Sequence, residues 1–185
     1  SFIFRSREFE QMEMEFFVKP GEADQWYDHW REARWNWYLD ALGVKAENLR
    51  MEEHEEKNLA HYAKAAVDVV YNFPFGWQEI EGIHNRTDFD LKSHMEHSGK
   101  DLLYHDQETN EKFIPWVIET SAGVERSCLV AMVDAYAEDE IGGEKRTVMR
   151  FRPEVAPVKV AVFPLQKKAE LQEVAKSLYM ELKSL

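Results

Sequence analysis

Five residues near the start of the chain have side chains suited to binding a charged ligand: Arg5, Arg7, Phe9, Gln11 and Glu13. Because successive strand side chains point to opposite faces, a strand over residues 2 to 18 would place all five on one face. Arginine forks match phosphate oxygens, an aromatic ring can stack on a purine base, and a carboxylate suits an ammonium group. The pattern therefore indicates a ligand-binding face, although mixed charge is also common on a solvated strand.

The segment from Arg5 to Phe9 resembles motif 2 of the class II aminoacyl-tRNA synthetases, whose pattern is Arg-x-x-x-Phe. Longer strings resemble one family of this class, the dimeric bacterial-type glycyl-tRNA synthetases. They are REFEQMEMEFF, GWQEIEGIHNRTDFDLKSH at residues 76 to 94, ETSAGVERSCLVAMVDAY at 119 to 136, and VAPVKVAVFPLQKK at 155 to 168. The third string stands in the place of motif 3. Because the four matches follow the family's order, the resemblance covers nearly the whole chain.

The resemblance implies an α+β fold, with a mainly antiparallel β-sheet flanked by helices. Residues 1–150 would form the C-terminal part of the catalytic core, and residues 151–185 the truncated start of an α/β anticodon-binding domain. The chain would then begin inside motif 2, without motif 1 and without the first motif 2 strand. Since preorganised charged contacts are important for catalysis, we expect such a fragment to be inactive alone.

Local sequence patterns predict the elements that would position these motifs. Apolar spacing, ended by Gly43, predicts a helix over residues 22 to 42. In the next part of the chain we predict a helix over 46 to 70, a strand over 77 to 83, a loop and hairpin region over 92 to 113 and a strand over 113 to 121. A helix over 124 to 137 and a connection between domains over 138 to 154 would follow. The last predicted elements are a buried strand over 158 to 165 and a helix over 167 to 182.

By resemblance, ATP would contact ten residues: Phe4, Arg5, Arg7, Phe9, Glu79, Ile80, Gly123, Val124, Glu125 and Arg126. Arg5 and Arg126 would be catalytic, binding the phosphates from opposite sides, while Phe9 stacks on adenine. A cation in the first turn of a helix is unfavourable without an anion to face, which supports the role of Arg126. Glu79 would either help to hold Mg²⁺ or be a solvated partner of Arg86.

Glycine has no side chain to recognise, so its pocket must bind the ammonium group and exclude larger amino acids. The resemblance assigns this pocket to Phe9, Gln11, Glu13, Arg86, Glu119, Ser121 and Gly123. Glu119 and Ser121 share one face of their predicted strand. Arg86 would pair either with the glycine carboxylate or with the pocket glutamates. Alternatively, the glutamates are edge-strand charges that prevent aggregation.

The implied reaction is the ATP-dependent ligation of glycine to tRNA(Gly) through a glycyl-adenylate. Such a reaction depends on positioning and charge neutralisation, so it needs no protein nucleophile. The resemblance also implies that the protein is a cytoplasmic homodimer. It would need Mg²⁺ and would have no membrane or DNA partner. The net charge of −12 opposes RNA binding unless the basic surface lies outside this chain. Alternatives are another class II adenylate-forming ligase and a non-catalytic interaction module derived from a synthetase.

The single cysteine and a histidine-containing segment argue against a cysteine nucleophile and a zinc site. Cys128 is the single cysteine and lies in an apolar run, so we predict a buried small hydrophobe, consistent with a reducing compartment. The segment HEEKN at 54 to 58 is similar to a zinc HExxH motif. However, Asn58 stands where the second histidine ligand would be, so we predict no metal there.

Overall fold

The computed structural model describes residues 2–55, 57 and 59–185. Asn58, on which the interpretation of the HEEKN segment depends, lies outside the described residues. The chain forms two compact units, of which one ends at Phe151 and the other spans residues 152–185. The assignment of these two parts to a catalytic core and an anticodon-binding domain stays a prediction.

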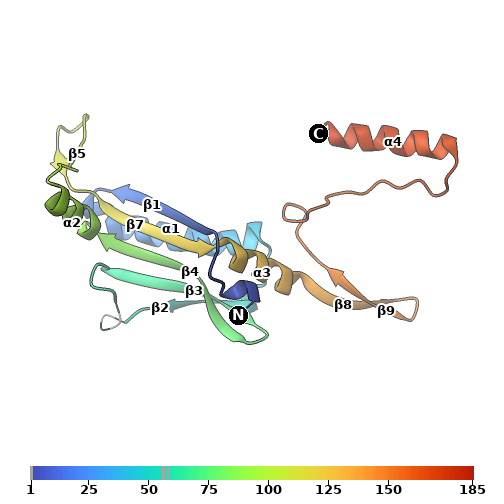
Figure 1. The fold of residues 1–185 in the computed structure, drawn as a ribbon, viewed down its shortest axis with the longest axis horizontal. Helices are drawn as coiled ribbons and strands as arrows, with labels where there is room; N and C mark the ends of the chain where they lie inside the picture. The colour runs from blue at the N-terminus through green and yellow to red at the C-terminus, as the bar shows by residue number, and fades with distance from the viewer. Residues whose placement is uncertain (1, 56, 58) are drawn as a thin grey trace. The chain divides into compact units, whose positions relative to one another are not determined.

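Five antiparallel strands form the sheet at the centre of the first unit (Figure 1). In spatial order they are β1 (Gln11–Val18), β7 (Trp116–Gly123), β4 (Gly76–Thr87), β3 (Ala65–Phe73) and β2 (Leu49–Glu53). This sheet, with helices beside it, confirms the predicted mainly antiparallel α+β fold.

The strand register brings residues from distant parts of the sequence into rows across one face of the sheet. Ser121 of β7 is paired with Glu13 of β1 on one side and with Gly82 of β4 on the other. In the next row, Glu119 is paired with Glu15 and His84 in the same way. Since paired residues share a face, β7 places these carboxylates next to one another.

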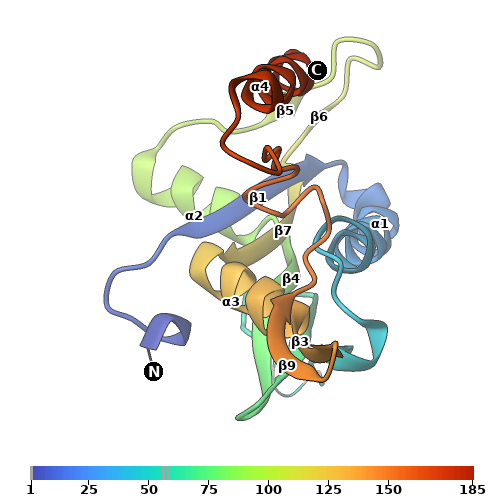
Figure 2. The ribbon, with the colours of Figure 1, turned by 90° about the vertical axis from the view of Figure 1, so that its right-hand side faces the viewer.

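Helix α1 (Ala23–Asn36) covers the other face of the sheet and continues into a short π-helical turn, Trp37–Ala41. Its tryptophans pack against Phe16 of β1, with ring centres 4.7 Å away for Trp26 and 5.4 Å away for Trp30. Figure 2 shows α1 on one side of the sheet and the N-terminal 3₁₀ turn, Phe2–Phe4, on the other. The predicted helix over 22 to 42 is therefore confirmed, and its aromatic residues belong to the core.

The long strand predicted over residues 2 to 18 is wrong in its first half, since β1 begins only at Gln11. Its partner β7 ends at Gly123, opposite Gln11, and becomes helix α3 (Val124–Ala135), so the ladder cannot continue. The carbonyl of Glu10 instead accepts a hydrogen bond from the Val124 amide, at 3.0 Å. Residues 5–10 therefore form an irregular segment, and the strict alternation of faces does not apply to them.

Two other predicted elements are also wrong. Residues 46 to 70 do not form an α-helix, since they contain β2 and the larger part of β3. The β-branched and aromatic residues from Val67 to Phe73 favour a strand between two others, and this preference outweighs the charged start of the segment. Residues 158 to 165 form no strand and are largely exposed, because no other described strand pairs with them.

The remaining elements lie at the ends of the first unit and in the second. Helix α2 (Phe89–Ser98) follows β4, so the loop and hairpin region predicted over 92 to 113 is wrong in its first part. Its second part contains the hairpin β5 (Tyr104–His105) and β6 (Lys112–Phe113), which precedes β7. The hairpin β8 (Tyr136–Ile141) and β9 (Glu144–Met149) follows α3, and α4 (Ala169–Lys183) lies in the second unit, where a helix was predicted. None of the described helices has both the length and the apolar character of a membrane span.

Candidate functional site

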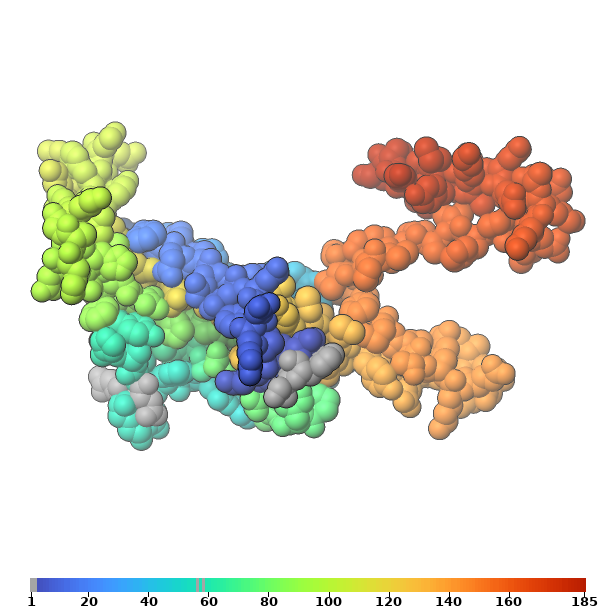
Figure 3. Space-filling view, in the orientation of Figure 1, coloured from blue at the N-terminus to red at the C-terminus, as the bar shows by residue number. Residues whose placement is uncertain are grey.

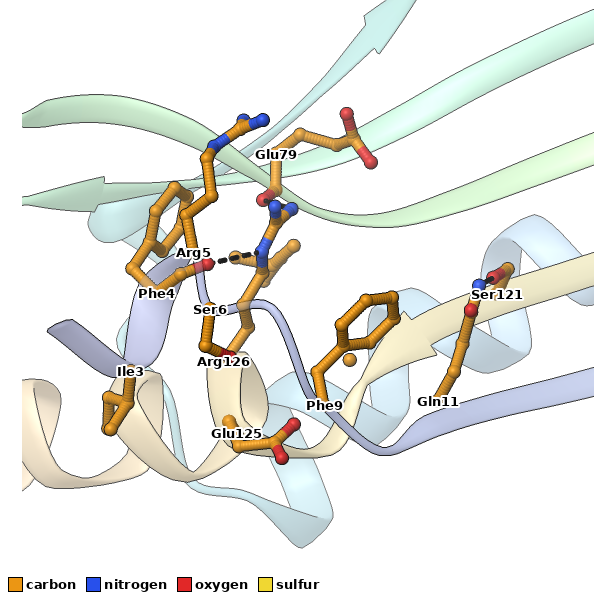
Figure 4. A pocket seen from close by; sticks show the side chains of 12 residues that line it. Ile3, Phe4, Arg5, Ser6, Phe9, Gln11, Glu79, Ser121, Glu125 and Arg126 are labelled. Atoms are coloured by element: carbon orange, nitrogen blue, oxygen red, sulfur yellow. Dashed lines mark hydrogen bonds between the residues drawn. The ribbon is translucent and has the colours of Figure 1, made fainter. Parts of the chain in front are cut away.

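A pocket of about 360 Å³ lies where β7 ends and α3 begins. In the space-filling view the N-terminal segment lies across the surface of the first unit (Figure 3). Figure 4 shows side chains from this segment, β4, β7 and α3 directed toward the pocket. Its lining consists of Ile3, Phe4, Arg5, Ser6, Phe9, Gln11, Glu79, Ile80, Ser121, Gly123, Glu125 and Arg126. Three of the segments that carry the sequence resemblance therefore meet at one pocket.

Of the ten residues predicted to contact ATP, only Arg7 and Val124 do not line the pocket. Arg7 belongs to the irregular segment, so it does not share a strand face with Arg5. Val124 is the first residue of α3, and its backbone amide holds the carbonyl of Glu10. Ile3 and Ser6 line the pocket although the sequence analysis did not select them. Ser6 lies within the motif 2 string, whereas Ile3 had no signal in the sequence.

The guanidinium of Arg126 connects the two walls of the pocket. Its Nε donates to the carbonyl of Phe4 at 3.2 Å, and its Nη1 donates to the carbonyl of Glu79 at 2.9 Å. The Phe4 ring lies against the guanidinium, 4.4 Å from its central carbon. Within the described part of the chain, Nη2 has no hydrogen-bond partner. Arg126 is therefore held in one orientation with a donor left for an anionic ligand.

The first turn of α3 fixes the backbone that presents Phe9. Both carboxylate oxygens of Glu125 accept the amide of Glu10, at 3.0 and 3.1 Å. Together with the bond from Val124, this contact fixes the residue that follows Phe9. The Phe9 ring is nevertheless 61% exposed. An exposed aromatic ring on a fixed backbone is a suitable surface for a planar ligand.

A polar cluster lies on the same sheet face at the β1 edge of the pocket. Gln11 Nε2 donates to Ser121 Oγ at 2.6 Å and to Glu13 Oε1 at 2.8 Å. The Ser121 hydroxyl in turn donates to Glu13 Oε1 at 3.1 Å. Gln11 and Ser121 line the pocket and Glu13 lies just outside it. One carboxylate oxygen of Glu13 is thus oriented by two neighbours, as a binding group requires.

Glu119 is buried one row further along this face and is contacted by the side chains of Arg86 and His84. Arg86 Nη1 donates to Glu119 Oε2 at 2.8 Å, while Arg86 also forms a two-bond contact with Asp90, at 2.8 and 3.2 Å. The His84 ring, and with it the Arg86 guanidinium, holds the pKa of the Glu119 carboxyl below its usual range, although burial acts in the opposite direction. Glu119 is therefore ionised at neutral pH.

Arg86 has protein partners on two sides. Its partners are Glu119 and Asp90, and the Tyr62 ring lies 4.3 Å from its central guanidinium carbon. The hydrogen bonds to Asp90 and Glu119 raise the pKa of Arg86, against the effect of burial. Among the described residues Arg86 thus pairs with Glu119 and Asp90 and not with Glu79, while its role toward glycine stays a prediction. Neither Arg86 nor Glu119 lines the pocket itself.

Glu15 and His84, which the sequence analysis did not select, belong to the same cluster. Glu15 is paired in register with Glu119, and burial together with the nearby Glu119 charge raises the pKa of Glu15. His84 Nδ1 lies 3.3 Å from Glu119 Oε2. The sequence signal was the spacing of two between His84 and Gly82 and between Glu15 and Glu13, which places each pair on one strand face.

The described residues contain no group of three or more His, Cys, Asp or Glu side chains arranged to hold a metal ion. Glu79 is exposed, whereas the Glu125 carboxylate already binds a backbone amide. Mg²⁺ commonly needs only one or two protein carboxylates when phosphates and water supply the other ligands. The residues therefore fit an ion that arrives with phosphates and that contacts the protein through Glu79.

Cys128 is exposed, so the prediction that it is buried is wrong. Helix α3 places Ser127, Val130 and Ala131 toward the sheet, and Cys128 lies on the other side of the helix. Apolar neighbours in sequence did not indicate burial here because only one helix face packs against the core.

The antiparallel sheet, with a strand that leads into α3 and an arginine at the start of that helix, has the architecture expected of a class II aminoacyl-tRNA synthetase core. The sequence comparisons find relatives of one kind within this class. The chain is 55% identical over 183 residues to a glycine–tRNA ligase from Caldanaerobacter subterraneus subsp. tengcongensis, 54% over 191 residues to one from Bifidobacterium longum, and 53% over 184 residues to one from Borrelia hermsii.

These alignments cover 98–99% of this chain but only 39–41% of each relative. Among models of known protein families, none matches the chain. The resemblance to bacterial glycyl-tRNA synthetases is thus confirmed, and it applies to a segment of about two fifths of their length.

Proposed function

We propose that this chain is part of a glycine–tRNA ligase and contributes its sites for ATP and glycine. The full-length protein would join glycine to ATP as glycyl-adenylate, release pyrophosphate and transfer the glycyl group to tRNA(Gly). The observation that carries this proposal is the meeting of three matched segments at one pocket with Arg5, Arg126 and Phe9 in its lining. The names and high identity of the relatives support the choice of glycine.

In this proposal the phosphates lie between Arg5 and Arg126, and adenine stacks on Phe9. The two guanidinium groups would neutralise the charge that develops as the glycine carboxylate attacks the α-phosphorus. Bound Mg²⁺ would supply further charge neutralisation at the phosphates, with Glu79 as its protein ligand. Arg126 has the best-defined geometry for this role, because the carbonyls of Phe4 and Glu79 fix its guanidinium.

The ammonium group of glycine would lie near the carboxylates of Glu13 and Glu119. Arg86 occupies Glu119 Oε2, while no described residue donates to Oε1. That second oxygen is thus available to an ammonium group. Ser121 stands next to Glu13 in its row, and its small side chain leaves space for a ligand without a side chain, whereas the His84 ring covers Gly82 on the other side of Ser121.

Transfer to tRNA, homodimer formation and a cytoplasmic location are further parts of the proposal. All three are consistent with the function named for the relatives. The acidic net charge favours a model in which other parts of the full-length protein bind most of the tRNA.

The direct test is ATP–pyrophosphate exchange by the full-length protein that contains this chain, with each amino acid in turn. Exchange that depends on glycine alone supports the proposal. Exchange with another amino acid would indicate a different class II ligase, and the absence of any exchange would favour an interaction module.

Phe9→Ala should weaken ATP binding by about 1–3 kcal/mol, the usual contribution of an aromatic ring that stacks on a base. Glycine affinity should change little, because Glu13 and Glu119 are untouched. Calorimetric titration of each ligand separately into the full-length variant measures both effects. Phe17→Ala is a matched control, since Phe17 is similarly exposed but does not line the pocket. If glycine binding is lost while ATP binding is unchanged, Phe9 belongs to the amino-acid site.

Glu119→Gln keeps the size of the side chain but removes the charge opposite the ammonium group. A hydrogen bond to a charged group contributes about 1.5–3 kcal/mol, so the affinity for glycine should fall at least about tenfold. Ser121→Ala should lose only about 0.5–1.5 kcal/mol, as for a neutral hydrogen bond. Titration with glycine and with ATP checks both variants. Unchanged glycine affinity in Glu119→Gln would show that this carboxylate is structural.

A further inference from the structure

The imidazole of His84 occupies the space that a side chain at Gly82 would need. A Cβ atom at position 82 would lie 2.6 Å from Cε1 of His84, well inside van der Waals contact. Both residues are on β4 and are two positions apart, so they share one face of the sheet. The ring therefore lies over the bare backbone of Gly82, and toward the row that contains Ser121 and Glu13.

In this position His84 faces the carboxylate of Glu119. The distance from His84 Nδ1 to Glu119 Oε2 is 3.3 Å, and the two residues are paired in register between β4 and β7. Nδ1 is buried and has no aligned hydrogen-bond partner among the described residues. Arg86 donates to the same oxygen at 2.8 Å. Two nitrogen-bearing groups on β4 thus approach Oε2, whereas no described residue donates to Oε1.

We propose that His84 is a positioning residue of the amino-acid site. It holds the Glu119 carboxylate, together with Arg86, so that Oε1 faces the ammonium group of glycine. The bare backbone at Gly82 is required because any side chain there would displace the ring. This inference rests on the proposed function, and it assigns roles to two residues outside the expected amino-acid contacts.

The test compares three substitutions at position 84 in the full-length protein. His84→Ala removes the ring and should raise the KM for glycine about tenfold in the exchange assay, with little change in the KM for ATP. His84→Asn keeps an N–H donor close to the position of Nδ1 and should recover most of the glycine affinity. His84→Leu keeps the bulk without a donor and should resemble His84→Ala. Equal behaviour of the Asn and Leu variants would overturn the positioning role.

Gly82→Ala provides an independent test in a double-mutant cycle. Alone, the added methyl group should push the ring away from Glu119 and raise the KM for glycine to a similar extent as His84→Ala. In the His84→Ala background the methyl group meets no ring, so it should cause little further loss. If instead the two effects multiply, Gly82 acts on the substrate directly and the proposed role of the ring is wrong.

Thermal unfolding of each variant separates a loss of folding from a loss of positioning. If His84 is a positioning residue, the His84 and Gly82 variants should unfold at temperatures close to that of the parent protein, although their KM for glycine changes. If the parent protein shows no glycine-dependent exchange, the proposed function itself is contradicted. Parent protein with exchange, combined with unchanged kinetics in all His84 variants, would contradict only the inference about His84.

Discussion

Arg126→Ala should lower the rate of glycine-dependent pyrophosphate exchange by about 10²–10³-fold, the usual loss when one preorganised charge-stabilising donor is removed. The guanidinium is fixed by the carbonyls of Phe4 and Glu79 and by the Phe4 ring, so it needs no rearrangement to meet the phosphates. The loss should appear mainly in kcat if the contact strengthens in the transition state.

Arg126→Lys should restore only a small part of the rate. A lysine keeps the charge but lacks the planar fork that contacts two carbonyls and a ligand together. Arg146→Ala is the matched control, because Arg146 forms an exposed pair with Asp139 on the β8–β9 hairpin and does not line the pocket. Its exchange rate should be unchanged. An Arg126→Ala rate within about threefold of the parent would mean that this residue only fastens the N-terminal segment.

The sequence predicted the parts of the candidate site that depend on the alternation of side chains along one strand and on motif order. Glu119 and Ser121 lie on one strand face as predicted, because the period of two holds throughout β7. The helix after Gly123 begins where the motif placed it, with Arg126 in its first turn. Both features are local, so neither required knowledge of the tertiary structure.

The features that the sequence did not predict depend on partners distant in the chain. Arg5 and Arg7 were expected on a strand, but β7 turns into α3 and leaves residues 5–10 without a strand partner. The segment over 46 to 70 forms strands because β3 pairs with β4 and β2 pairs with β3, whereas its charge pattern favoured a helix. His84 was overlooked because its contact with Glu119 depends on the pairing of β4 with β7.

Glu81→Ala should destabilise the first unit by about 3 kcal/mol, because it leaves a partly buried arginine without its partner. Glu81 is 1% exposed in the middle of the sheet, and Arg34 of α1 donates to both of its oxygens, at 2.6 and 3.1 Å. The Trp37 ring lies 4.5 Å from the Arg34 guanidinium and limits its access to water. The pair thus holds α1 against β4 beside Ala122, the residue of β7 between Ser121 and Gly123.

Urea unfolding followed by tryptophan fluorescence measures this effect, since Trp26, Trp30 and Trp37 lie on the helical segment that the pair fastens. Glu52→Ala is the matched control, because Glu52 pairs with Arg50 on the exposed edge strand and should change stability by about 1 kcal/mol or less. A double replacement of Arg34 and Glu81 by Met should be less destabilising than Glu81→Ala, because it leaves no unpaired charge. Equal losses for Glu81→Ala and Glu52→Ala would show that the buried pair does not hold α1 to the sheet, and that apolar packing of the tryptophans is sufficient.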